Sequence, residues 1–285
     1  MSGAKQNASQ LRMSDREFER LSSYIYSECG INITHSKKTM LEARLSKRLK
    51  QLGIESYRDY CNYLFGRHDE DEVVHMIDIV TTNKTEFFRE PAHFDYLART
   101  AAGELMKKHG AGIERELRVW SAGCSTGEEP YTLSIVLSEI CATRQRCAFS
   151  VLATDISTRV LQAAVKGIYE QEKIRHVPDH LKRKYFLRGK GEYSGLVRIS
   201  PDIRNKVEYR RLNLMEGDFG IRERMDIIFC RNVIIYFDRA TQEKLLGHFC
   251  ERLVPGGYIF MGHSETLHGM ALPLANAAPT VYRKK

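Results

Sequence analysis

The spacing of apolar residues along the chain changes in character near residue 80. Up to that point apolar residues recur every three to four positions, which is typical of amphipathic helices, and no strand-like apolar run occurs. Residues 14–17, Ser-Asp-Arg-Glu, match a capping box and predict the start of a helix. A second helix is predicted over about residues 37–52, because its leucines lie on one stripe. We therefore predict that residues 1–82 form an N-terminal all-α domain.

From about residue 116 onward, short apolar runs alternate with helical patterns. The runs predict strands at residues 116–121, 149–154, 225–230, 257–261 and 280–283. Strands that alternate with helices favour an α/β fold with a doubly wound, mainly parallel sheet covered on both faces. We assign residues 92–285 to this domain and residues 83–91 to a short linker that contributes to its ligand site.

One segment interrupts this alternation. Residues 193–199 and 206–212 have the pattern of short antiparallel strands, and glycines and a proline separate them. We therefore predict a small antiparallel β-subdomain inserted over about residues 189–212.

The composition is that of a globular protein, with 42% apolar and 28% charged residues. No window approaches 18 apolar residues without a charge, so no membrane insertion is expected. Residues 1–11 are polar, so no secretory signal is expected. The seven cysteines are scattered without a Cys-x-x-Cys pair, which argues against a disulfide framework and a closed zinc site. We therefore expect reduced thiols, a cytoplasmic location and no metal.

The net charge of +8, with an isoelectric point near 9.1, is carried entirely by residues after position 80. A basic chain of this kind can bind nucleic acid, acidic protein surfaces or anionic cofactors. The charge alone does not choose among these partners.

The first predicted strand is followed by a segment of small residues and then by two glutamates. Ligands of open parallel sheets bind beyond the carboxyl ends of the strands, so this segment, residues 121–130, is a candidate ligand loop. It lacks both a Gly-x-Gly-x-x-Gly pattern and a phosphate-loop lysine. Glu128 and Glu129 at the start of the next helix disfavour a pyrophosphate and favour a cationic ligand. Alternatively, they only complement the helix dipole.

Three further strand ends carry polar residues suited to a nucleoside. Asp155 closes the second strand, where a carboxylate can accept hydrogen bonds from ribose hydroxyls or cap the next helix. Asn213 and Leu214 offer an amide and an apolar wall for an adenine ring. Asn232 follows the third strand and precedes apolar and aromatic residues that line an adenosine pocket or belong to the core. Together these features favour S-adenosylmethionine, which combines an adenosine with a sulfonium cation and lacks phosphate.

Four segments of the chain carry a resemblance to a known family. They are Thr81–Glu90 (TTNKTEFFRE), Val119–Tyr131 (VWSAGCSTGEEPY), Ile228–Phe237 (IFCRNVIIYF) and Gly262–Glu265 (GHSE). On these segments the chain resembles, over about residues 14–283, the CheR family of chemotaxis receptor methyltransferases. The resemblance implies a helical N-terminal domain, a Rossmann-like class I methyltransferase domain and a three-stranded β-subdomain inserted in it. It also implies methyl transfer from S-adenosylmethionine to receptor glutamates, which gives glutamyl methyl esters and S-adenosylhomocysteine.

Carried over position by position, the resemblance implies a set of site residues. The expected cofactor-binding residues are Asn83, Thr85, Arg89, Glu129, Asp155, Asn213, Leu214, Asn232 and Val233. Arg89 and Tyr236 border the expected methyl-transfer site, and Arg89 is the candidate that holds the acceptor carboxylate, unless it pairs with Glu86 or Glu90. An acceptor glutamate is already ionised near neutral pH, so this chemistry requires no general base.

The predicted helix over residues 37–52 is strongly basic. Arg44, Lys47, Arg48 and Lys50 share one flank, which is either a solvated helix face or a surface that docks on acidic receptor helices. The resemblance further implies that the β-subdomain can bind a peptide at the receptor's C-terminal tail by strand addition. We expect the protein to act as a monomer.

Two other functions remain open at this point. A nucleic-acid methyltransferase would agree with the positive charge, but its Asn-Pro-Pro-Tyr-like base-flipping motif is absent from the sequence. A non-catalytic, S-adenosylmethionine-binding regulator of chemotaxis would be expected to lack part of the residue set. The presence of Asn83, Arg89, Glu129, Asp155 and Asn232 argues against it.

Overall fold

The computed structural model describes residues 12–66 and 70–285 and divides them into two compact units. The described residues up to Thr81 form the first unit, and those from Thr82 onward form the second. Residues 1–11, in which we expect no secretory signal, lie outside the described residues.

The first unit is helical throughout its described residues. Its helices are α1 (Asp15–Cys29), the 3₁₀ turn η1 (His35–Lys37), α2 (Lys38–Leu52), α3 (Tyr57–Gly66) and α4 (Glu70–Val80). The predicted capping box is present, because Ser14 accepts from the Glu17 backbone N–H and the Glu17 side chain accepts in return from Ser14. The helix predicted over residues 37–52 is confirmed as α2, whose leucines at positions 41, 45 and 49 are buried. Local signals in the sequence, a capping box and a leucine stripe, therefore correctly predict helices α1 and α2.

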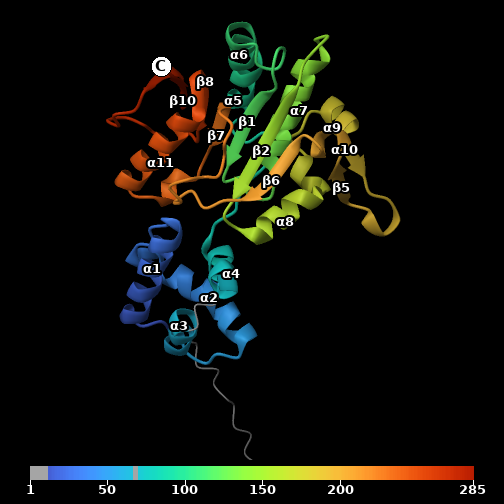
Figure 1. Cartoon of the computed structure of the whole chain (residues 1–285). Helices are drawn as coiled ribbons and strands as arrows, with labels where there is room; N and C mark the ends of the chain where they lie inside the picture. Colours follow the sequence, from blue (N-terminus) through green and yellow to red (C-terminus); the bar gives the residue numbers. More distant parts are fainter. Residues whose placement is uncertain (1–11, 67–69) are drawn as a thin grey trace, which may run out of the picture. The chain divides into compact units, whose positions relative to one another are not determined.

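The second unit is built on a seven-stranded, mainly parallel sheet with helices on both faces (Figure 1). Its strands are β1 (Leu117–Ala122), β2 (Phe149–Asp155), β6 (Val207–Arg211), β7 (Met225–Cys230), β8 (Leu253–Met261), β9 (Leu274–Ala278) and β10 (Val281–Lys284). They follow the order β6-β2-β1-β7-β8-β10-β9, in which β10 runs antiparallel to both of its neighbours. The predicted doubly wound α/β class is confirmed.

Helices cover this sheet because its strands bury side chains on both faces. The helices of the unit are α5 (Pro91–Tyr96), α6 (Ala102–His109), α7 (Glu128–Ala142), α8 (Thr158–Lys166), α9 (Asp179–Tyr185), α10 (Pro201–Arg204) and α11 (Arg239–Arg252). A π-helical turn (Leu97–Ala101) joins α5 to α6. One core cluster joins the sheet to α5, α6 and α7, and a second joins its other face to α11. Successive residues of β1 divide between them, since Val119 packs in the first cluster and Trp120 in the second.

A separate three-stranded antiparallel sheet confirms the predicted β-subdomain, but the predicted boundaries were wrong. Its strands are β3 (Ile168–Glu170), β4 (Phe186–Arg188) and β5 (Leu196–Ile199), in the order β3-β5-β4, with short 3₁₀ turns η3 (Gln171–Ile174) and η4 (Gly191–Tyr193) between them. Residues 206–212 do not belong to it, because β6 pairs in parallel with β2 in the main sheet. As an edge strand, β6 keeps most of its side chains exposed or half-buried, so its residue pattern resembles that of an isolated strand.

The expectation that all seven thiols are reduced was wrong for one pair. Cys141 and Cys147 form a disulfide with a Cα–Cα distance of 5.1 Å. The chain reverses between α7 and β2, and this reversal brings the two residues together. The five other cysteines are free and buried.

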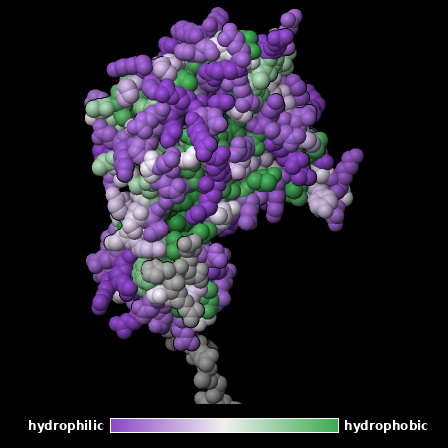
Figure 2. Space-filling view, viewed as in Figure 1, coloured by the Kyte–Doolittle hydropathy of each residue, from purple (hydrophilic) through white to green (hydrophobic). Residues whose placement is uncertain are grey.

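None of the described helices is long and apolar enough to cross a membrane. Hydrophilic residues cover most of the face seen in Figure 2. Among the few large apolar side chains that are well exposed are Ile168, Leu187 and Tyr193, all in the antiparallel β-subdomain.

Candidate active site

The carboxyl ends of four parallel strands bring the predicted ligand segments to one edge of the sheet. Residues 123–127 follow β1, Asp155 closes β2, residues 231–236 follow β7, and Gly262 follows β8. Because β6 is also parallel to β2, Asn213 and Leu214 reach this edge as well. The corrected strand assignment therefore explains how these two residues join the others.

Two of these segments pack against each other through a glycine. Gly123 has a positive φ of 80°, and a Cβ atom placed on it would lie 2.4 Å from Cγ2 of Val233. Only glycine fits this contact, since any side chain would displace Val233. The loops after β1 and β7 therefore pack against each other and together form the floor of the candidate site.

Asp155 ties the loop after β1 to the start of α8. Its carboxylate is largely buried and accepts from the backbone N–H of Ser125 (2.8 Å) and of Ser157 (2.9 Å). Ser157, rather than Asp155, caps α8, because its hydroxyl accepts from the Val160 N–H. The proposed cap role of Asp155 was therefore wrong.

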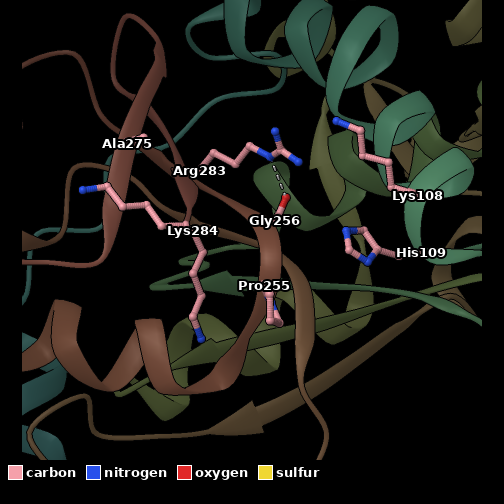
Figure 3. Close-up of a pocket in the computed structure, with 8 residues that line it drawn as sticks. Lys108, His109, Pro255, Gly256, Ala275, Arg283 and Lys284 are labelled. Atoms are coloured by element: carbon pink, nitrogen blue, oxygen red, sulfur yellow. Dashed lines mark hydrogen bonds between the residues drawn. The ribbon is translucent and has the colours of Figure 1, made fainter.

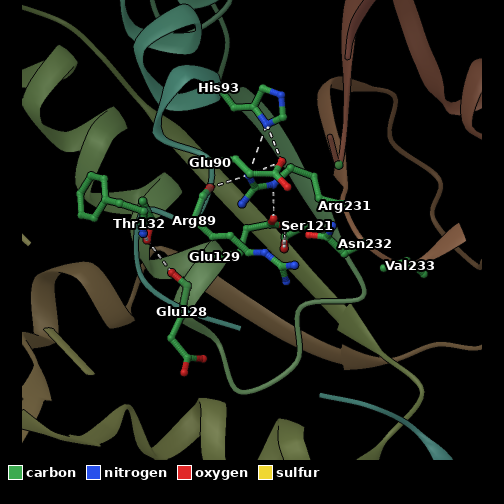
Figure 4. Close-up of polar contacts among 12 residues, drawn as sticks. Arg89, Glu90, His93, Ser121, Glu128, Glu129, Thr132, Arg231, Asn232 and Val233 are labelled. Atoms are coloured by element: carbon green, nitrogen blue, oxygen red, sulfur yellow. Dashed lines mark hydrogen bonds and ion pairs between the residues drawn. The ribbon is translucent and has the colours of Figure 1, made fainter. Parts of the chain in front are cut away.

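Glu129 and Arg231 form a buried ion pair at the centre of this edge (Figure 4). Arg231 Nε donates to Glu129 Oε2 at 2.7 Å, and the Ser121 hydroxyl donates to Oε1 at 2.7 Å. Both side chains of the pair are at most 10% exposed. Glu128 points away from this pair and holds Thr126 and Lys173 instead. The two neighbouring glutamates thus have different surroundings, and Arg231 compensates the charge of only one.

The guanidinium of Arg231 also organises the segment that carries Arg89. Its Nη1 donates to the Arg89 carbonyl at 2.6 Å and lies 3.5 Å from Glu90 Oε2 and 3.2 Å from His93 Nδ1. Burial, together with the charge of Arg231, lowers the pKa of His93 to about 4. His93 is therefore neutral at pH 7 and accepts from Arg231.

Glu90, His93 and His263 place ligand-type atoms within 4.8 Å of one another, a spacing that can hold a metal ion. The Arg231 guanidinium, however, lies within 3.5 Å of the Glu90 carboxylate and the His93 ring. A metal ion there would have to displace this cation, so the chemistry of the cluster fits an arginine site better than a metal site.

Asn232 has a backbone conformation unusual for a residue other than glycine. Its φ is +59°, in the left-handed region. Its side-chain Oδ1 is buried and has no hydrogen-bond partner within the described part of the chain. A buried acceptor without a partner is costly, so this atom suits a bound group that carries an N–H or O–H donor.

The segment 83–90 contacts the same floor within the second unit. The Asn83 carbonyl accepts from the Ser125 hydroxyl at 3.0 Å, and the Phe88 N–H donates to Thr132. Arg89 donates to the Lys84 carbonyl at 3.1 Å and makes no ion pair with Glu86 or Glu90 within the described residues. The alternative in which an acidic neighbour neutralises Arg89 was therefore wrong.

Four expected site residues remain to be placed: Thr85, Asn213, Leu214 and Tyr236. Thr85 is half-buried in the segment before Arg89, and Tyr236 is half-buried in the 3₁₀ turn η5 (Ile234–Tyr236). Leu214 packs against the second core cluster, and Asn213 accepts from the Met215 N–H through its side chain. Neither contact tests whether Asn213 and Leu214 bind a nucleoside, so this role stays a prediction.

Sequence reasoning missed two residues that organise the site, Arg231 and Glu265. Both lie inside family-like segments, but an arginine or a glutamate after a strand is not distinctive by itself. Their roles depend on partners far away in the sequence, such as Glu129, which lies 102 positions from Arg231.

The four basic residues of α2 fall into two groups. Arg48 holds the buried Glu72 through three hydrogen bonds, and Arg44 donates to the Val80 and Thr81 carbonyls. Lys47 and Lys50 are exposed. Two of the four predicted docking residues therefore also stabilise their own unit, because α2 packs against α4.

A basic cavity of about 410 Å³ lies at the opposite edge of the sheet (Figure 3). It is lined by Lys108, His109, Pro255, Gly256, Ala275, Arg283, Lys284 and Lys285. Lys108 and Arg283 lie near Glu104, and Lys284 donates to backbone carbonyls at the end of α11. Since it contains none of the expected cofactor residues, this cavity is separate from the site.

The strand order with its reversed β10, together with the acidic and amide groups at the carboxyl edge, defines a Rossmann-like methyltransferase domain. Residues 83–282 match the model of the CheR methyltransferase S-adenosylmethionine-binding domain, and residues 16–81 match that of the CheR all-α domain. The chain therefore belongs to the CheR family and is an S-adenosylmethionine-dependent methyltransferase.

Curated relatives resemble the chain over nearly its whole length. The chemotaxis protein methyltransferase of Borreliella burgdorferi is 38% identical over 269 residues, which cover 94% of each chain. Those of Salmonella typhimurium and Escherichia coli are each 38% identical over 277 residues, 97% of this chain and 93% of the relative. These likenesses assign the methylation to chemotaxis.

Proposed function

We propose that this protein transfers the methyl group of S-adenosylmethionine to glutamate carboxylates of chemotaxis receptors, giving glutamyl methyl esters. The observation that carries the proposal is the gathering, at one sheet edge, of an unneutralised Arg89 with the buried Glu129–Arg231 pair and the unpartnered acceptor of Asn232. Arg89 suits an anionic acceptor. The Glu129–Arg231 pair and the Asn232 side chain suit a cofactor with an amino group and other N–H donors.

The residues present fit this cofactor. Asp155 would hold the ribose hydroxyls, Glu129 the amino group of the amino-acid tail, and Asn232 a further donor. Asn83, Thr85, Arg89, Asn213, Leu214 and Val233 would complete the site. When bound, S-adenosylmethionine supplies a methyl group on a cationic sulfur. No metal takes part in this proposal, because a carboxylate nucleophile needs no Lewis acid.

Arg89 would hold the acceptor glutamate in line for attack on the methyl carbon, beside Tyr236. A carbon–oxygen bond forms as the carbon–sulfur bond breaks, and no proton moves, since the acceptor is ionised at neutral pH. Correct alignment can supply roughly 7–11 kcal/mol of a barrier in favourable cases. The chain therefore needs positioning groups rather than a general base.

The test is incubation with methyl-labelled S-adenosylmethionine and a receptor cytoplasmic fragment. We expect label on glutamate that mild alkali releases as methanol, because an ester is labile where an N-methyl group is not. Label that survives alkali, or that appears on added DNA or RNA, would contradict the proposal and favour the nucleic-acid alternative. Binding of the cofactor without transfer would favour a non-catalytic regulator.

We further propose that the β-subdomain binds the receptor's C-terminal tail by strand addition. Strand β4 is at the edge of its sheet, and Leu187 and Tyr193 expose large apolar side chains near it. The same labelling assay with a fragment that lacks its tail should then give slower methylation. Equal rates with and without the tail would exclude this contact. The protein would act as a monomer in the cytoplasm, where the receptor glutamates lie.

Lys47 and Lys50 are proposed to attract an acidic receptor surface. We expect the double substitution Lys47→Glu and Lys50→Glu to slow receptor methylation about tenfold at low salt, with the difference shrinking at high salt. The readout is the initial labelling rate at several ionic strengths. A matched control, Lys107→Glu with Lys244→Glu, makes the same charge change on α6 and α11. If both double variants slow methylation equally, net charge rather than docking is responsible.

A further inference from the structure

Glu265 is a buried carboxylate that accepts four backbone hydrogen bonds. It follows β8, and its side chain is only slightly exposed. Oε1 accepts from the N–H groups of Val233 (2.9 Å) and Ile234 (3.0 Å). Oε2 accepts from those of Asn232 (2.9 Å) and Gly262 (2.6 Å). Three consecutive N–H groups of the loop after β7 therefore converge on one charge.

This convergence explains how Asn232 keeps its left-handed backbone. Asparagine adopts this conformation more readily than other residues with a Cβ atom, but the conformation still costs free energy, which other contacts offset. Charge-assisted hydrogen bonds from its own N–H and from the next two residues are such contacts. With a different backbone at position 232, the three N–H groups would no longer reach the same carboxylate.

Gly262 completes the arrangement on the other side of Asn232. A Cβ atom placed on Gly262 would lie 2.7 Å from Asn232 Nδ2 and 2.8 Å from Glu265 Oε2. The Asn232 side chain and the Glu265 carboxylate thus both pack closely against Gly262, which leaves no room for a side chain there. Its Oδ1 remains buried without a partner, although the surrounding backbone groups are paired.

We propose that Glu265 is a positioning residue, which fixes Asn232 so that its unpartnered Oδ1 accepts a hydrogen bond from bound S-adenosylmethionine. The proposal rests on the proposed cofactor site. Glu265 acts through the backbone N–H groups of the loop after β7. Its loss therefore lowers the affinity for the cofactor more than the rate of the methyl-transfer step.

The substitution Glu265→Gln tests this role because it preserves size while changing hydrogen bonding. Glutamine presents an NH₂ group to two of the four N–H donors, so the loop loses its anchor without a cavity forming. We expect the Kd for S-adenosylhomocysteine, measured by calorimetry, to rise about tenfold. With the receptor fragment, the KM for S-adenosylmethionine should rise similarly while kcat changes less than about threefold.

A double-mutant cycle separates positioning from general destabilisation. If Glu265 acts through Asn232, the pair Glu265→Gln and Asn232→Ala should weaken binding no further than Asn232→Ala alone. The matched control is Asp226→Asn, which disturbs a buried carboxylate held by Arg115 at the opposite end of β7. It should lower the unfolding temperature and leave the Kd unchanged.

Wild-type affinity in Glu265→Gln, or additive losses in the double variant, would overturn the positioning role. Glu265→Asp, which keeps the charge but is too short to reach all four donors, gives a second reading if the Gln variant does not fold. Failure of the wild-type protein to bind S-adenosylhomocysteine would instead contradict the proposed function itself.

Discussion

Replacing Arg231 with Met is expected to lower the free energy of unfolding of the second unit by about 3–5 kcal/mol and to abolish measurable cofactor binding. Methionine fills a similar volume but leaves Glu129 buried with, among the residues that the structure describes, only the Ser121 hydroxyl as a hydrogen-bond partner. The Arg89 carbonyl loses its donor as well, so the segment 83–90 loses its attachment to the end of β7.

The measurement is denaturant unfolding followed by the fluorescence of Trp120, the only tryptophan, which is buried in the affected unit. Arg224→Met is the control, because this arginine is exposed in the loop before β7 and should change stability by less than about 0.5 kcal/mol. Adding Glu129→Gln to Arg231→Met should restore part of the stability, since it removes the unpaired charge. A loss of unfolding free energy below about 1 kcal/mol in Arg231→Met would show that the buried Glu129 does not need Arg231 to compensate its charge.

Replacing Arg89 with Ala is expected to slow methyl transfer about 10²-fold, because the acceptor carboxylate loses the group proposed to align it with the methyl carbon, and a misplacement of about 1 Å can cost this much. Stability should change little, because within the described residues the Arg89 side chain donates to a single backbone carbonyl. The affinity for S-adenosylhomocysteine should fall by a smaller factor, since several other residues are proposed to hold the cofactor.

Single-turnover labelling of a receptor fragment and calorimetry with S-adenosylhomocysteine measure these two effects separately. Lys84→Ala is the matched control, because it removes a neighbouring positive charge and should leave both values near those of the wild type. Arg89→Lys should recover part of the rate, since it restores charge without the planar pair of donors. Wild-type turnover and affinity in Arg89→Ala would remove Arg89 from the site.

The helices of the first unit and the central strands of the second could be predicted because their signals are local. A capping box, a leucine stripe and a short buried apolar run each depend on residues a few positions apart. Strand β6 could not be assigned in this way, because an edge strand with exposed polar residues has the same pattern in either sheet. The disulfide between Cys141 and Cys147 depends on a chain reversal that cysteine spacing does not encode.

Local patterns in the sequence were enough to place these residue types near the strand ends: Asp155 closes β2, Glu129 lies at the start of α7 after β1, and Asn232 follows β7. The residues that each of them contacts depend on the order of the strands in the folded sheet. Glu129 meets Arg231 across 102 positions, and Asn232 meets Glu265 across 33. Local conformation depends on residues that are near in the sequence. A buried charged side chain instead pairs with a side chain on a neighbouring strand end, and the order of the strands in the sheet determines which strand ends are neighbours.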